Sequence, residues 1–201
     1  RKGEAIQTMK EVKFIVFDKT GTITKGKPEV TDISTIDKIS EKELLIISAS
    51  LEKLSEHPIA KAIVNKANLK IFKKVSRFKI LRGRGVEGKI GRDDIVIGNQ
   101  TLMKERKIDL KKLIKDVERF ENEGKTTMLI SKNKKILGAI AVADAIKEDS
   151  KEAVRRLNEK GYKTIMITGD NEKTANAIAK QVGIDKVIAN VLPEEKENKV
   201  K

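Results

Sequence analysis

The alternation of strand and helix patterns near the C-terminus is the feature that most constrains the fold. The stretch KTIMIT at residues 163–168 is typical of a buried strand, residues 171–182 have a helical pattern, and KVIAN at 186–190 is again strand-like. Such a unit forms two parallel strands joined by a right-handed crossover. The apolar run KFIVFD at residues 13–18 is typical of a strand covered on both faces. We therefore expect an α/β domain with an open parallel sheet.

The middle of the chain has a different pattern. Its predicted elements are a strand after Pro28, helices at 41–54 and from Pro58, a strand meander at 74–99, helices at 99–107 and 110–123, and a hairpin at 126–144. The meander indicates an antiparallel sheet. We therefore predict that residues 1–27 and 128–201 form the α/β domain and that 28–127 form an inserted α+β domain. Hinges are expected near residues 25–28 and 124–127.

Composition excludes several classes of protein. The chain has 201 residues, no Cys and one His, which excludes a disulfide framework or a thiolate metal site. Its net charge of +14 is typical of proteins that bind nucleic acid. However, the 44 Lys and Arg are interleaved with 30 Asp and Glu, and only 3% of residues are aromatic. We therefore expect no nucleic-acid partner. The longest apolar run, Ile136–Ala143, is too short to span a bilayer. Because the chain starts with Arg1 and stops within a helix-like run, we expect a piece of a longer protein.

The segment VFDKTGTITKGKP at residues 16–28 has two interpretations. From Gly21 to Lys27 it resembles a P-loop, but Pro28 stands where that motif needs a hydroxyl, and a strand pattern follows instead of a helix. From Asp18 it is a carboxylate at a strand end, where ligands bind in open α/β sheets. The Thr20–Thr22 loop offers N–H groups and hydroxyls to an anion. Asp18 could thus accept a phosphoryl group, although an Asp that only caps a turn is the alternative.

Two further strand ends carry residues suited to a phosphoryl group. Thr168, Gly169 and Asp170 follow a buried strand and open a helix, where a hydroxyl and free N–H groups suit a phosphoryl oxygen. Lys196 follows the last strand and could offset charge on the transferring group. By itself, Lys196 would more readily be interpreted as an ordinary exposed helix lysine. Three such strand ends in this order make chance a poor explanation.

These motifs resemble those of P-type ATPases. The signature DKTGT is intact at residues 18–22, and TGD and PEEK recur in the same order, so that the resemblance covers essentially the whole chain. It implies a haloacid-dehalogenase-like, Rossmann-type parallel sheet with an inserted nucleotide-binding domain, and the cofactors ATP and Mg²⁺. It implies Asp18 as the phosphorylated residue, and the Asp18 carboxylate and the Thr20 carbonyl as Mg²⁺ ligands. The other catalytic residues it implies are Lys19, Thr20, Thr22, Thr168, Gly169, Asp170 and Lys196.

The inserted domain resembles that of the heavy-metal-transporting branch. In that branch the His of Ser-Glu-His-Pro packs against adenine and the Glu hydrogen-bonds its edge, which here implies His57 and Glu56. The resemblance also implies a nucleotide pocket lined by Gly83, Gly85, Gly98 and Asn99. The run GRGVEG satisfies a dinucleotide-binding pattern, but a strand rather than a helix follows it. Ser-Glu-His-Pro favours copper as the transported ion, while a zinc or cadmium pump is the alternative.

Thr20 separates a pump from a phosphatase. In phosphatases of this superfamily a second Asp stands at that position and activates water, so with Thr20 the acyl phosphate is expected to persist. The resemblance implies partners in the same pump, namely an actuator domain and transmembrane domains, and a heavy-metal ion that this fragment does not bind. It implies a soluble cytoplasmic part of an integral membrane protein with low or no turnover alone. A soluble haloacid-dehalogenase-like phosphatase and a non-enzymatic nucleotide- or nucleic-acid-binding module are the alternatives.

Overall fold

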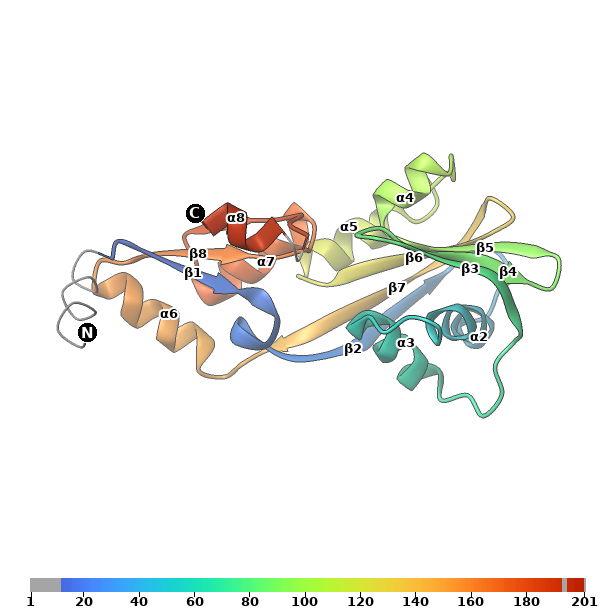
Figure 1. The fold of residues 1–201 in the computed structure, drawn as a ribbon, viewed down its shortest axis with the longest axis horizontal. Coiled ribbons are helices and arrows are strands. Elements are labelled where there is room, and N and C mark those ends of the chain that lie inside the picture. The colour runs from blue at the N-terminus through green and yellow to red at the C-terminus, as the bar shows by residue number, and fades with distance from the viewer. Residues whose placement is uncertain (1–11, 193–194, 201) are drawn as a thin grey trace. The chain divides into compact units, whose positions relative to one another are not determined.

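The chain forms two compact units in the computed structural model, which describes residues 12–192 and 195–200. Unit 1 comprises the chain up to Gly26 and from Ala145 onward, and unit 2 comprises Lys27–Asp144. Figure 1 shows their elements. Residues 1–11 of the predicted first segment lie outside the described residues. In the part of the chain that the structure describes, no helix is long and apolar enough to cross a membrane.

Unit 1 is built on a parallel sheet of three strands in the order β1-β8-β9. These strands are β1 (Phe14–Asp18), β8 (Lys163–Ile167) and β9 (Lys186–Ile188). Asp18 pairs with Ile167, so that the carboxyl ends of β1 and β8 are level with each other. The predicted parallel sheet is thus confirmed.

The helices of unit 1 are α6 (Ser150–Glu159), α7 (Glu172–Val182) and the short α8 (Lys196–Val200). Asn171 begins α7 by accepting a hydrogen bond from the backbone N–H of Thr174, and Gly183 ends it in a left-handed conformation. The core comprises Ile23, Val154, Met166, Ala175, Ile178, Ala179, Val182 and Ile184. This core fixes the strands whose ends carry the predicted site.

The turn η1 (Lys19–Ile23) follows β1 directly. Thr20 has φ −74° and ψ 122°, and Gly21 has φ 77° and ψ −12°, which are the central angles of a type II turn. The second central position of that turn requires a positive φ, which explains why a glycine stands there.

Unit 2 is built on a six-stranded sheet in the order β2-β7-β6-β5-β4-β3. The predicted antiparallel meander is confirmed, because β3 to β7 pair antiparallel in succession. The strands are β2 (Thr24–Thr35), β3 (Val75–Leu81), β4 (Gly85–Ile90), β5 (Asp93–Gly98), β6 (Thr126–Lys132) and β7 (Lys135–Ile146). The helices are α2 (Glu41–Glu52), α3 (Pro58–Ala67), α4 (Gln100–Glu105) and α5 (Ile114–Asn122).

Helices cover both faces of this sheet, and each face has its own core. On one face Ile130, Ile140 and Val142 join α2 and α3 in a cluster. On the other, Leu129 and Ala141 join Phe120 of α5. Successive strand residues therefore point into opposite cores, as the two-residue period of a strand requires.

The hairpin of β6 and β7 lies in unit 2, and the chain returns to unit 1 between Asp144 and Ala145. This differs from the predicted boundary between residues 127 and 128. The apolar sequence of β7 resembles that of a strand in a parallel sheet, because β7 is a strand between β2 and β6 with a core on each face. Gly124 therefore does not lie where the chain passes between units, whereas Gly26, with φ 71°, does.

The first crossing also differs from the sequence prediction. A new strand was expected after Pro28, but β2 begins at Thr24 and continues through the proline. Because β2 is an edge strand, it tolerates a residue without an N–H group. The predicted helix at 110–123 begins later, at Ile114.

Candidate active site

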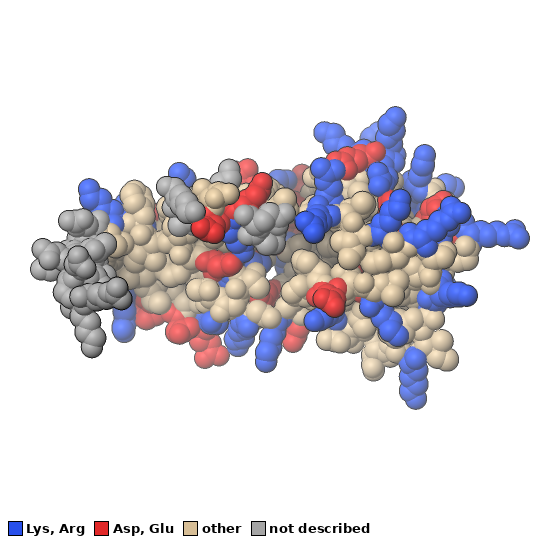
Figure 2. Space-filling model, in the orientation of Figure 1, with Lys and Arg blue, Asp and Glu red and all other residues tan. Residues whose placement is uncertain are grey.

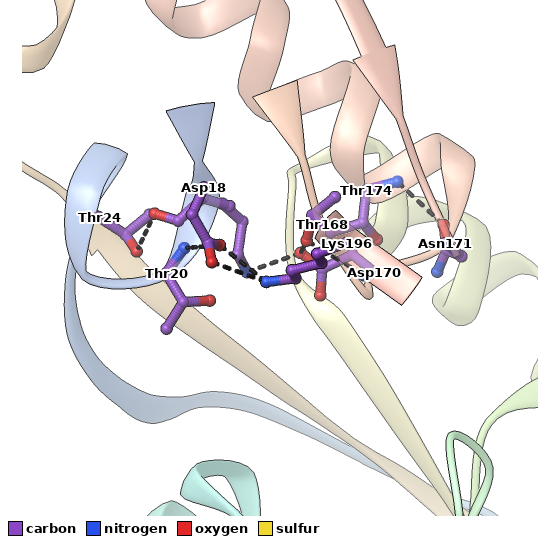
Figure 3. A network of polar contacts seen from close by, with 9 residues as sticks. Asp18, Thr20, Thr24, Thr168, Asp170, Asn171, Thr174 and Lys196 are labelled. Carbon is purple, nitrogen blue, oxygen red and sulfur yellow. Dashed lines mark hydrogen bonds and ion pairs between the residues drawn. The ribbon is translucent and has the colours of Figure 1, made fainter. Parts of the chain in front are cut away.

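The carboxylate of Asp18 lies at the end of β1 and is held by a lysine from the C-terminal helix. The Nζ atom of Lys196, in α8, is 2.9 Å from Oδ1 and 2.8 Å from Oδ2 of Asp18 (Figure 3). The backbone N–H of Thr20 also donates to Oδ1, at 3.2 Å. The Asp18 side chain remains 43% exposed, so that a ligand can reach it. Asp18 therefore caps the turn and also presents an exposed carboxylate, so the structure has the feature that each interpretation of this residue requires.

A second ion pair joins the turn after β1 to the end of β8. Nζ of Lys19 lies 2.6 Å from Oδ2 of Asp170. The hydroxyl of Thr168 donates to the same Oδ2 at 2.9 Å, and the N–H of Asp170 donates to Thr168 Oγ1 at 3.2 Å. Gly169 lies between them and is exposed. The structure thus brings together the residues predicted at three strand ends, and it pairs predicted catalytic residues with each other, namely Lys196 with Asp18 and Lys19 with Asp170.

The carbonyl groups of the turn after β1 accept hydrogen bonds from several parts of unit 1. The Lys19 carbonyl accepts from the Thr24 hydroxyl at 3.1 Å, and the Gly21 carbonyl accepts from Nζ of Lys147 at 2.7 Å. The Ile23 carbonyl accepts from the Ser150 hydroxyl at 2.8 Å and from the N–H of Lys147 at 3.0 Å. Thr22 is exposed in this turn. The turn is therefore anchored through its carbonyl groups.

The predicted metal ligands are Asp18, the last residue of β1, and Thr20, in the turn that follows it. A carboxylate and a backbone carbonyl are hard oxygen donors of the kind that Mg²⁺ prefers. Among the described residues no group of three or more His, Cys, Asp or Glu is placed to hold a metal ion. These two oxygens fit Mg²⁺ only when phosphate oxygens and water complete its shell, which is the usual way this ion binds at phosphate sites.

The residues predicted to bind the base lie in unit 2, where α3 begins. His57 precedes Pro58, and its Nδ1 accepts a hydrogen bond from the N–H of Ile59 at 3.2 Å. This contact fixes the imidazole ring at the helix start while the residue remains exposed. Glu56 is exposed beside it.

The predicted pocket residues lie where β3 turns into β4 and where β5 ends. The side-chain amide of Asn99 donates to the Gly83 carbonyl at 3.0 Å, and its oxygen accepts from the N–H of Leu102, at the start of α4. A Cβ on Gly85 would lie 2.0 Å from the Ile97 carbonyl oxygen, and one on Gly98 would lie 2.2 Å from that of Arg84. Close approach of neighbouring parts of the chain therefore explains why glycine stands at both positions.

Glu52 is a residue of this region that the sequence analysis missed. It lies at the end of α2, five positions before His57, and is only 3% exposed. Its side chain has no hydrogen bond or ion pair within the described part of the chain, and burial raises the pKa of its carboxyl to about 7. Perturbed carboxyl groups of this kind cluster at functional sites. The sequence signal that could have identified it is a Glu within the apolar pattern of the helix.

Comparison with known proteins places the chain in a family. The family of haloacid dehalogenase-like hydrolases matches residues 12–201, and the chain therefore belongs to it. A copper-exporting P-type ATPase of Staphylococcus aureus (strain Newman) is 46% identical over 197 residues, which are 96% of this chain and 24% of that protein. The chain thus spans about a quarter of the length of this curated relative.

Solved structures agree with this assignment. The catalytic domain of the CPx-ATPase CopB-B, from a study of nucleotide binding, has a TM-score of 0.69 and 29% identity, covering 98% of this chain and 68% of that one. A zinc-transporting PIB-type ATPase in its E2.Pi state has a TM-score of 0.64 and 34% identity, covering 94% of this chain and 31% of that one. In sequence and fold the chain corresponds to the catalytic region of heavy-metal P-type ATPases, which confirms the predicted resemblance.

Proposed function

We propose that this chain is the ATP-binding and phosphorylation region of a heavy-metal cation pump, with copper as the favoured ion. The single observation that carries the proposal is the contact of Lys196 with both carboxylate oxygens of Asp18 at the end of β1. An exposed carboxylate with a lysine on both oxygens, beside the Thr168–Asp170 strand end, suits a group that receives a phosphoryl group. The copper-exporting relatives support the choice of ion, while the zinc-transporting neighbour keeps zinc as the alternative.

In the proposed reaction an oxygen of Asp18 attacks the γ-phosphorus of ATP. The new bond forms as the bond from the γ-phosphorus to the β,γ-bridging oxygen breaks, and ADP leaves with that electron pair. Lys196 offsets the negative charge that gathers when the phosphoryl group approaches the carboxylate. The Asp18 carboxylate and the Thr20 carbonyl would hold Mg²⁺, which neutralises phosphate oxygens when it is bound.

We propose that unit 2 binds the nucleotide at the start of α3. The fixed, exposed ring of His57 can stack on the base, and Glu56 offers a carboxylate beside it. Glu52 offers a second, buried carboxyl group in the same part of the sequence. Gly83, Gly85, Gly98 and Asn99 are proposed to line the same pocket. Their contacts with each other would keep its wall rigid.

Thr20 supports a pump over a phosphatase. It is an exposed, uncharged residue at the position where a phosphatase of this family needs a second carboxylate to activate water. The acyl phosphate would therefore persist until the rest of the pump acts on it. The proposed partners are accordingly ATP and the actuator and transmembrane domains of the same pump, while the transported ion binds outside this chain.

The test is labelling of the chain with ATP that carries radioactive γ-phosphate, in the presence of Mg²⁺, followed by quenching in acid. We expect a label that hydroxylamine removes, as it does from acyl phosphates, and no label in Asp18→Asn. Equal labelling of Asp18→Asn, or none of the unmodified chain, would refute the proposal. Rapid cleavage of p-nitrophenyl phosphate would favour the phosphatase alternative.

A further inference from the structure

The peptide group between Gly21 and Thr22 is held by a lysine from a distant part of unit 1. Nζ of Lys147 donates to the Gly21 carbonyl at 2.7 Å, although Glu148 and Asp149 follow it directly in the sequence. Within the described residues this is the one polar contact of that ammonium. An ammonium that is bound to a backbone carbonyl, with two carboxylates next in sequence, indicates a specific role for the contact.

The contact determines which way a neighbouring N–H group points. A peptide group is planar and trans, so its C=O and N–H bonds point in opposite directions. Fixing the Gly21 carbonyl on Lys147 therefore directs the Thr22 N–H away from the ammonium. Glycine at position 21 would allow the opposite orientation, because a residue without a Cβ tolerates a wide range of backbone angles, and apart from its chain neighbours no atom lies within 4 Å of the place where a Cβ would be.

The next carbonyl in the turn is held from the same segment. The Ile23 carbonyl accepts from the backbone N–H of Lys147 and from the hydroxyl of Ser150, which is buried at the start of α6. Residues 147–150 thus hold the second half of the turn by its carbonyl groups. Only the contact at Gly21 comes from a charged donor, and hydrogen bonds to charged groups are the stronger ones.

We propose that Lys147 is a positioning residue for Asp18 phosphorylation. It keeps the Gly21 carbonyl turned toward itself and the Thr22 N–H available to phosphoryl oxygens, without touching the substrate. This role in the reaction rests on the proposed function. The orientation of the peptide group can be measured independently of it.

The first experiment is hydrogen exchange of the backbone amides at residues 20–24 in Lys147→Met, with Lys147→Arg as the conservative variant. Lys151→Met, an exposed lysine on α6, is the matched control. We expect about tenfold faster exchange in Lys147→Met, because a hydrogen bond from a charged group is lost. Lys147→Arg and Lys151→Met should exchange like the unmodified chain. If Lys147→Met lowers the thermal midpoint, exchange is compared equally far below each midpoint, and unchanged exchange there would overturn the proposal.

The second experiment separates positioning from a general loss of structure. The rate of Asp18 labelling by ATP should fall about tenfold in Lys147→Met and recover in Lys147→Arg, while ATP affinity, measured by calorimetry, stays unchanged. An unchanged labelling rate, or an equal loss of affinity and rate, would contradict the proposed role. If the unmodified chain takes no label, the proposed function fails, and the exchange experiment still decides how the turn is held.

Discussion

Lys19 and Asp170 form an ion pair of 2.6 Å in which each side chain is only 10% exposed. The pair joins the turn after β1 to Asp170, which lies just before Asn171, where α7 begins. Both residues were expected in the site from sequence, but their contact with each other indicates that they fix the distance between two strand ends. Charges so far from water are stabilising only while both are present.

Removing one partner of this pair should destabilise the chain. Lys19→Met leaves the Asp170 carboxylate buried without its cation, and we expect a loss of about 3 kcal/mol in the free energy of unfolding. The double variant Lys19→Met with Asp170→Leu should lose less than the sum of the two single variants. Urea unfolding of all four chains measures this, and strictly additive losses would show that the pair is not coupled.

Stability should fall as pH rises from about 4.5 to 7 because of Glu52. Burial raises the pKa of its carboxyl from 4.5 to about 7, so the folded chain binds a proton there that the unfolded chain has released. The contribution of this proton to the free energy of unfolding is fully present below pH 4.5, and about 3 kcal/mol of it is lost by pH 7. Glu52→Gln should remove this slope and be more stable than the unmodified chain at pH 8. An identical pH dependence in the two chains would contradict the prediction.

Asp32 should act in the opposite direction at acid pH. The hydrogen bond from Lys125, whose Nζ is 2.6 Å from Asp32 Oδ2, holds the pKa of this carboxyl below its usual value. Its contribution is therefore present above pH 3.8 and is lost as pH falls through the lower folded pKa. In Lys125→Met this contribution should be missing, so the variant should be less stable above pH 3.8, and its difference from the unmodified chain should shrink as pH falls further. Acid unfolding of both chains tests this, with Lys134→Met, on the exposed β6–β7 turn, as the control.

The main effect of Gly85→Ala should be to destabilise unit 2, and any effect on ligand binding should be smaller. The new Cβ would meet the Ile97 carbonyl at 2.0 Å, so β4 and β5 would have to separate, at a cost of about 3 kcal/mol or more. Gly88→Ala, in the same strand with its nearest atom at 3.3 Å, is the matched control and should cost less. A folded Gly85→Ala chain of unchanged stability that no longer binds ATP would assign the glycine to the ligand alone.

The chain alone should show no sustained ATP hydrolysis after Asp18 is labelled. Thr20 has no carboxylate to activate water, and among the described residues no group of three or more His, Cys, Asp or Glu is placed to hold a metal ion. Phosphate release should therefore stop near one turnover, as a colorimetric phosphate assay can measure. Continuous release that Asp18→Asn abolishes would show that the chain needs no further domain for hydrolysis.

Residues at strand ends were the most predictable part of the site. Asp18 and Thr168 each follow a short apolar run, and the parallel pairing of β1 with β8 then brings them close. Glu52 was missed although it stands within the apolar pattern of α2, because that pattern does not show how deeply the end of the helix is buried. Lys147 was not predictable, since its partner is a backbone carbonyl 126 positions away.

The domain boundary shows where pattern alone is ambiguous. An unbroken apolar strand predicts cover on both faces, and β7 has such cover. A parallel sheet would cover both faces of such a strand, and so would an antiparallel sheet between two layers of helices. The net charge of the chain was ambiguous in a similar way. In Figure 2, Lys and Arg project from many places on the face in view, with Asp and Glu between them.

The sharing of β6 and β7 between two cores has a consequence for how unit 2 melts. Leu129 and Ala141 belong to one core, while their sequence neighbours Ile130 and Ile140 belong to the other. Both cores are therefore built on the same two strands, and disorder that separates these strands would disrupt both cores. The inserted unit should therefore unfold in a single cooperative transition, despite having two separate hydrophobic layers.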